Sequence, residues 1–201
     1  MSNTKKYFLL LGVVTLFFIG CGETSNPDKQ LALEEPIVEE LDSAKYLKEG
    51  GEIAQATFKV LSENLQKAMA EGGVENALKF CNVNAMPLTD SLSKHYNVEI
   101  KRTSHKVRNP KNAPTVQEQV NIDAYLANKM TKPTLQENPN HSVSFYAPIT
   151  MKGLCVVCHG QVGTTLAEKD YQIIQSLYPQ DKAIGFNVDE LRGMWSITFN
   201  K

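Results

Sequence analysis

Residues 155–159 constrain this chain more than any other segment, because they read Cys-Val-Val-Cys-His. Two cysteines separated by two residues, with a histidine directly after the second, have the spacing at which a c-type haem is attached. Each thiol forms a thioether with one haem vinyl group, and the histidine is then held beneath the iron. We therefore expect one covalent haem c, attached through Cys155 and Cys158, with His159 as the proximal iron ligand.

The same cysteine spacing also occurs in zinc sites and in thioredoxin-like redox pairs. A structural zinc site usually takes a second pair of Cys or His ligands, and no such pair follows Cys158 in the sequence. A redox pair uses only the two thiols and does not need His159. The complete pentapeptide therefore favours haem attachment over both alternatives.

The first twenty residues have the pattern of a bacterial export signal. Lys5 and Lys6 supply positive charge, and an apolar run over 7–19 follows them. This run is too short for a comfortable membrane span. It leads into Phe-Ile-Gly-Cys at 18–21, which is similar to a lipobox, so we expect signal peptidase cleavage before Cys21 and acylation of its thiol. An uncleaved anchor helix and a plain secretory signal are the alternatives.

Residues 21–42 are expected to be an acidic tether between the lipid and a haem-binding domain over 43–201. The stretch contains two prolines and no aromatic residue, which is typical of a flexible segment. Bacteria attach haem c outside the cytoplasm, so the export signal and the haem motif agree. We expect an extracytoplasmic protein held on a bacterial membrane by its lipid.

Charge excludes a nucleic-acid-binding protein. The chain has 21 basic and 22 acidic residues, with no basic block and no arginine-rich stripe. Removal of the signal also removes Lys5 and Lys6, which leaves the mature protein more acidic. The expected partners are the membrane, through the lipid, and a redox or signalling protein that the sequence does not identify.

Helices are expected first and strands later, which indicates an α+β fold. A helix over 41–71 should end at Gly72 and Gly73. A second helix should be interrupted by Pro87, or a new turn should start there, leading on to about Tyr96. Later elements are expected to be a strand over 98–103, a helix from the capping box at 115–118 to about 130, β-structure over 142–150, a helix over 165–178 and a strand over 194–199.

Cys81 has no role once Cys21 carries lipid and the motif cysteines carry haem. It could be an inert buried thiol, because a free cysteine packs as a small apolar side chain. It could also be the second iron ligand, because it lies on the apolar face of its expected helix. Apolar residues share that face at spacings of three and four: Val74, Ala77, Leu78, Ala85 and Leu88. The residues alone leave both interpretations open.

Other side chains compete for the second axial position or for the haem edge. The competing ligands are His95, His105, His141, Met86, Met130 and Met151. A lone surface histidine is more often solvated than ligating, and Met86 is better explained by core packing. Arg102 and Arg108 are the candidate partners of the haem propionates, because a guanidinium pairs with a carboxylate through two hydrogen bonds. Tyr146 and Trp195 fit either the porphyrin edge or the core.

The order of several short motifs resembles a family of exported haem-binding domains, long catalogued without a function, whose prototype is a cyanobacterial c-type haem protein of PAS-like fold. The resemblance covers about 53–200 and rests, beside the haem motif, on residues 79–81, 102–104, 108–114, 145–149, 181–185 and 191–196. It implies a PAS-like antiparallel sheet with long N-terminal helices. It also implies that His159 and Cys81 are the two axial ligands.

A thiolate and an imidazole together would decide what such a haem does. A thiolate donates charge strongly and favours ferric iron, so the reduction potential is low. Two protein ligands also leave no open position for a substrate, so we expect no enzymatic reaction in the resting state. A haem peroxidase would need His105 and Arg108 on an open distal face.

Two functions remain. We expect low-potential electron transfer, with an extracytoplasmic redox or gas sensor as the alternative, in which a diatomic ligand replaces the thiolate after reduction. Related domains are fused to histidine kinases and chemoreceptors, and no such module follows in this sequence, which favours electron transfer.

Overall fold

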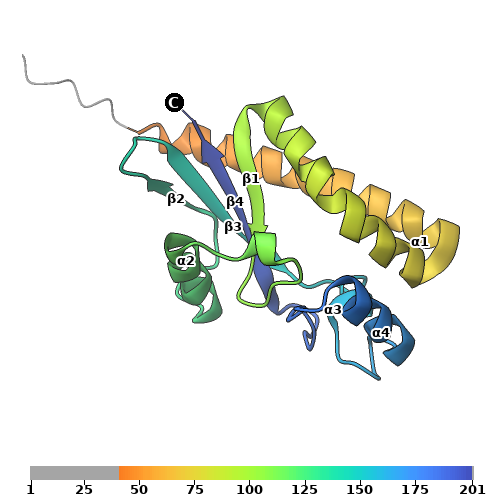
Figure 1. Ribbon diagram of the computed structural model, residues 1–201. Helices are drawn as coiled ribbons and strands as arrows, with labels where there is room; N and C mark the ends of the chain where they lie inside the picture. Colours follow the sequence, from red (N-terminus) through yellow and green to blue (C-terminus); the bar gives the residue numbers. More distant parts are fainter. Residues whose placement is uncertain (1–40, 201) are drawn as a thin grey trace, which may run out of the picture. The chain divides into compact units, whose positions relative to one another are not determined.

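A four-stranded antiparallel sheet forms the centre of the protein, seen here in a computed structural model that describes residues 41–200 (Figure 1). The expected signal peptide, Cys21 and nearly all of the expected tether lie outside the described residues. The strands are β1 (Val98–Thr103), β2 (Thr134–Glu137), β3 (Val143–Thr150) and β4 (Leu191–Phe199), in the order β1-β4-β3-β2. With the helices described below, this is the predicted α+β architecture.

One face of the sheet is apolar over most of its length, and α1 (Ser43–Tyr96) covers it. Strand register places Ile100, Ile197 and Phe145 in one row across β1, β4 and β3. Side chains alternate between the two faces of a strand, so Arg102 and Trp195, two positions along, lie on this same face. Arg102 therefore belongs to the face that packs against α1, at the end of the sheet where β3 leads into residues 155–159.

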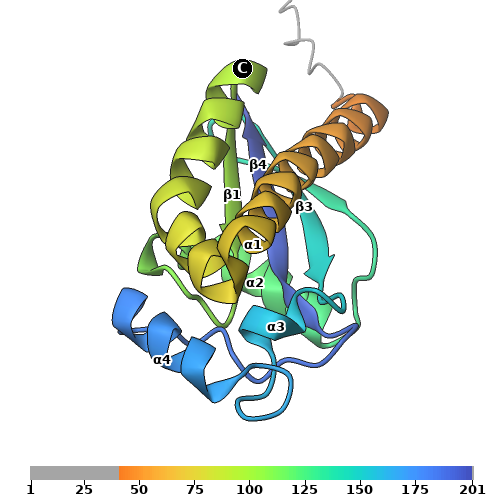
Figure 2. The same cartoon turned by 90° about the vertical axis from the view of Figure 1, so that its right-hand side faces the viewer.

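Helix α1 consists of two helical limbs joined by a sharp reversal at Gly72 and Gly73. Both glycines depart from helical backbone angles, and Gly73 has a φ of 69°, which glycine adopts without steric cost. The second limb runs back beside the first, as Figure 2 shows. Its Ser93 hydroxyl accepts a hydrogen bond from the Ile100 N–H at 3.0 Å, which ties this limb to β1. The predicted break at the two glycines is confirmed.

The second limb continues through Pro87, so the prediction that this proline interrupts the helix is wrong. A proline inside a helix removes the hydrogen bond to the carbonyl four residues earlier. That carbonyl belongs to Val83, which is 66% exposed, and Pro87 is exposed as well. Because both lie at the protein surface, water can bind the carbonyl and the helix tolerates the missing bond.

The opposite face of the sheet packs against α2 (Val116–Leu126). Thr115 and Glu118 form the predicted capping box, and Glu118 also forms an ion pair of 2.7 Å with Lys101 on β1. The helix ends at Leu126 rather than near residue 130, because Asn128 adopts a left-handed conformation with a φ of 55°. Ile122 and Tyr125 pack from this helix against the sheet.

The remaining elements are short. They are a 3-10 turn at Pro110–Asn112, α3 (Val156–His159) and α4 (Glu168–Leu177). Strand β2, which the sequence analysis missed, is a four-residue edge strand with no alternation of apolar and polar residues to reveal it. Within residues 41–200, no helix is both long enough and apolar enough to cross a membrane.

Gly50 and Gly51 provide a test of the contact between α1 and the sheet. A Cβ atom on Gly50 would collide with the Phe145 ring, whereas one on Gly51 would meet no atom within 4 Å. We expect Gly50→Ala to destabilise the protein by about 1–3 kcal/mol through overpacking. Gly51→Ala should stabilise it by about 0.5–1 kcal/mol, because alanine is the better helix former. Urea unfolding of both variants is the measurement, and equal effects would contradict this packing.

Candidate functional site

The motif at 155–159 folds into a single helical turn close to the end of β3. The His159 N–H donates to the Cys155 carbonyl at 3.0 Å and closes this turn, which is α3. The two cysteines are three residues apart and therefore point to the same side of the turn. Cys155 packs beside a buried cluster that contains Met151 and Phe186. The turn thus presents two thiols one after the other, with a histidine next to them.

The His159 imidazole is fixed by a hydrogen bond to the backbone. Its Nδ1 lies 2.7 Å from the carbonyl oxygen of Ala183. A carbonyl can only accept, so the proton is on Nδ1 and the lone pair is on Nε2. Burial lowers the pKa of His159 well below its usual value, and the charges of Arg192 and Arg108 act in the same direction. The ring is therefore neutral at pH 7, which is the form that binds a metal through Nε2.

Cys81 reaches this region from the second limb of α1. Leu78, one helical turn before it, is buried in a cluster that also contains Cys158 and Leu166. Burial raises the pKa of the Cys81 thiol, whereas Arg102 and Arg108 favour its thiolate. Burial likewise raises the pKa of Cys158 to about 11, and the charges of Cys81 and Cys155 add to the increase. The fold therefore places Cys81 near Cys158, although the two residues are more than 70 positions apart.

Arg102 lies on the sheet face that α1 covers. Burial lowers the pKa of its guanidinium, which forms no hydrogen bond to another described residue. Of the neighbouring groups, an ionised Cys81 would stabilise the charged guanidinium most. Arg102 is therefore a cation with hydrogen-bonding capacity left for a ligand, as its predicted role toward a propionate requires.

Arg108 is in a different situation, because its guanidinium is already bonded to the protein. It holds the Asp181 carboxylate through two hydrogen bonds of 3.2 Å, and its Nη2 donates to the Cys158 carbonyl at 2.7 Å. The propionate contact stays a prediction for Arg108. The structure adds that this side chain supports the turn of the motif directly.

The sequence analysis gave no role to three residues that contribute to the site. They are Asp181, Ala183 and Arg192, which all lie within the short motifs at 181–185 and 191–196. The Arg192 Nη1 donates to the Ser104 hydroxyl at 3.0 Å and to the Lys106 carbonyl at 3.1 Å. Burial, with the charge of Arg108, lowers the pKa of Arg192 to about 10. The placement of these residues in the resemblance was the only signal that could have identified them.

The competing ligand candidates separate by position. His141 lies in the turn between β2 and β3, at the far end of the sheet, and pairs with Glu137 at 3.1 Å. His95, near the end of α1, packs edge to face against the Tyr96 ring, and Met130 packs with α2 on the opposite face. His105 and Met151 are closer to the motif, because both contact Phe186 or its cluster. His105 has a buried Nδ1 without a hydrogen-bond partner among the described residues.

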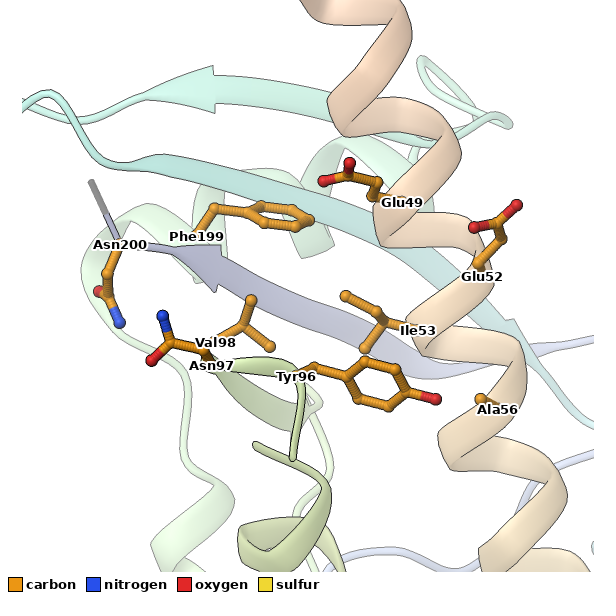
Figure 3. A pocket seen from close by; sticks show the side chains of 9 residues that line it. All are labelled: Glu49, Glu52, Ile53, Ala56, Tyr96, Asn97, Val98, Phe199 and Asn200. Atoms are coloured by element: carbon orange, nitrogen blue, oxygen red, sulfur yellow. The ribbon is translucent and has the colours of Figure 1, made fainter. Parts of the chain in front are cut away.

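A cavity of about 520 Å³ lies elsewhere, between the first limb of α1 and the ends of β1 and β4 (Figure 3). Ile53, Val98 and Phe199 provide its apolar wall, and Glu49 and Glu52 lie along α1 beside it. Val98 pairs with Phe199 at the end of the sheet opposite to the motif. This cavity is therefore not part of the site. Within residues 41–200, no group of three or more His, Cys, Asp or Glu side chains is arranged to hold a metal ion.

The profile of the family described as Tll0287-like matches residues 34–200. The chain belongs to this family. It is also similar to a solved structure, the cyanobacterial heme-protein Tll0287, with 22% sequence identity and a TM-score of 0.55 over 77% of this chain and 96% of that chain. At this identity the likeness establishes the fold. No curated protein matches the chain. The family resemblance indicated by the order of the motifs is confirmed.

Proposed function

We propose that this chain is a c-type haem protein in which Cys155 and Cys158 attach the haem and His159 binds the iron. The observation that carries this proposal is the turn at 155–159, where two thiols precede an imidazole whose Nδ1 is committed to the Ala183 carbonyl. This donor set fits a haem, because it offers two attachment points and one neutral nitrogen ligand in five residues. Membership of the Tll0287-like family supports it, since a structure of that fold is described as a heme-protein.

Cys81 is proposed as the second axial ligand. It comes from the second limb of α1, so the two ligands would be held by segments that are remote in sequence. Its thiol is partly buried, which disfavours ionisation, while Arg102 and Arg108 favour the thiolate that a metal requires. Haem, when bound, supplies a one-electron redox centre, and an anionic sulfur ligand would favour its oxidised state.

Low-potential electron transfer is the function that we propose for this site. Two protein ligands would leave no open coordination position, and the bonds of Arg108 to Asp181 and Cys158 remove a free distal cation that a peroxidase would need. Binding of a diatomic gas to the reduced protein would instead indicate the sensor that we consider as the alternative. An optical spectrum of the reduced protein with and without carbon monoxide distinguishes the two.

Cys81→Ala tests the ligand assignment, with Met86→Ala as a matched control from the same limb of α1. The wild type should show low-spin ferric EPR and a long-wavelength sulfur-to-iron charge-transfer band. We expect Cys81→Ala to lose this band and to raise the potential by at least about 59 mV, equivalent to a tenfold change in relative ligand affinity for the two oxidation states. Met86→Ala should retain the band, because the Cys81 thiolate that gives rise to it is still present. An unchanged spectrum in Cys81→Ala would eliminate this ligand.

The proposed location is the extracytoplasmic side of a bacterial membrane, facing the periplasm or at the cell surface, with Cys21 carrying the lipid. The export pattern of residues 1–20 supports this, together with the extracytoplasmic attachment of haem c. We expect metabolic lipid labelling of the wild type and loss of the label in Cys21→Ser, with haem retained in both. A wild type that takes up no lipid label would contradict the tether and leave the haem proposal intact.

A further inference from the structure

The Arg108–Asp181 ion pair lies directly behind the turn that carries His159. Both side chains are largely buried, with 12% of Arg108 and 3% of Asp181 exposed. The Arg108 Nε and Nη2 each donate to one carboxylate oxygen of Asp181 at 3.2 Å. This side-on geometry fixes the plane of the guanidinium and therefore the direction of its remaining hydrogen bonds.

Both members of the pair continue to His159 through Ala183. The Asp181 carboxylate accepts a hydrogen bond from the Ala183 N–H at 2.9 Å. The Arg108 Nη2 donates to the Ala183 carbonyl at 3.3 Å, and the same carbonyl accepts the proton of His159 Nδ1 at 2.7 Å. Arg108 also donates to the Cys158 carbonyl at 2.7 Å. One ion pair thus orients both the Ala183 carbonyl, which accepts from His159, and the Cys158 carbonyl in the peptide bond before His159.

We propose that Arg108 and Asp181 are positioning residues for the proximal histidine: they hold the Ala183 carbonyl where it fixes the tautomer and the ring orientation of His159. This inference rests on the proposed function, in which His159 is the iron ligand. It differs from the propionate contact expected from the sequence. Here Arg108 acts on His159, the proposed iron ligand, through the Ala183 carbonyl that both side chains contact. Groups that hold the second nitrogen of a ligating histidine orient the ring and raise its basicity.

Other hydrogen bonds also hold the backbone around this pair. Gly185 N–H donates to the Gly160 carbonyl at 2.9 Å, and Phe186 N–H donates to the His159 carbonyl at 3.0 Å. Lys182 N–H also donates to the Val107 carbonyl at 2.9 Å. These bonds already hold residues 182–186 against the motif and the loop after β1. Removing one partner of a buried ion pair leaves the other charge uncompensated and destabilises a protein by about 3–5 kcal/mol, so the test of orientation uses readouts at His159 itself in variants that remain folded.

Arg108→Met and Arg108→Lys form the test, with Lys152→Met as the matched control. Like Arg108, Lys152 forms an ion pair near the motif, with Asp189 at 3.5 Å. Its pair is at the surface, because the two side chains are 66% and 80% exposed. The measurement is displacement of the proximal ligand by added imidazole in the ferric holoprotein. We expect the half-saturating imidazole concentration to fall about 10–100-fold in Arg108→Met, the usual effect of losing such a support. The sulfur-to-iron band should persist, because the histidine and not Cys81 is displaced.

Arg108→Lys separates positioning from charge. A lysine keeps the positive charge but offers a single nitrogen, which cannot hold Asp181 side-on and also bind two carbonyls. We expect it to behave like Arg108→Met, and Lys152→Met to behave like the wild type. Solvent exchange of the Nδ1 proton of isotope-labelled His159, followed by NMR, should be faster in both Arg108 variants. This second readout does not depend on the other axial ligand.

Three results would overturn the inference. They are wild-type imidazole binding and proton exchange in Arg108→Met, wild-type behaviour of Arg108→Lys beside an altered Arg108→Met, and an effect of Lys152→Met as large as that of Arg108→Met. A wild-type protein that carries no covalent haem would contradict the proposed function instead. Haem content after denaturation, measured for every variant, keeps these two failures apart.

Discussion

The hydrogen bond from His159 Nδ1 to the Ala183 carbonyl is the interaction on which the site depends. It places the proton on Nδ1 and leaves the lone pair of Nε2 free, so the ring has the tautomer that the proposed iron ligand requires. Burial keeps the ring neutral, because a low pKa prevents protonation at neutral pH. Two hydrogen bonds hold this carbonyl in place. Arg108 donates one to the carbonyl itself, and Asp181 accepts the other from the N–H of Ala183. The geometry of the motif is thus set by residues outside it.

The fold assembles this site from three remote parts of the chain. The reversal at Gly72 and Gly73 brings the second limb of α1 back along β1, which places Cys81 near the sheet end where Arg102 lies. Strand β3 leads the chain to the same end and into the turn at 155–159. The segment at 181–186 then returns across that turn before β4 begins. A small antiparallel sheet therefore acts as the frame that brings Cys81 and the turn at 155–159, which are remote in sequence, to one end of the sheet.

The parts of this architecture that were predictable are those with local causes. Thr115 with Glu118 makes a helix start visible, and two adjacent glycines make a reversal visible, because each effect lies within a few residues. Pro87 misled the prediction because its consequence depends on exposure, which a sequence does not show. The Cys-Val-Val-Cys-His motif at 155–159 was visible for the same local reason. The Arg108–Asp181 pair was not, because its partners are 73 positions apart in the chain.

The mass of the purified protein under denaturing conditions tests the central claim most directly. Non-covalent haem separates from an unfolded chain, whereas thioether bonds survive. The account predicts that the wild type retains the mass of one haem and that replacement of both Cys155 and Cys158 by alanine removes it. A wild-type chain whose denatured mass equals that of its amino acids and lipid alone would contradict covalent haem attachment.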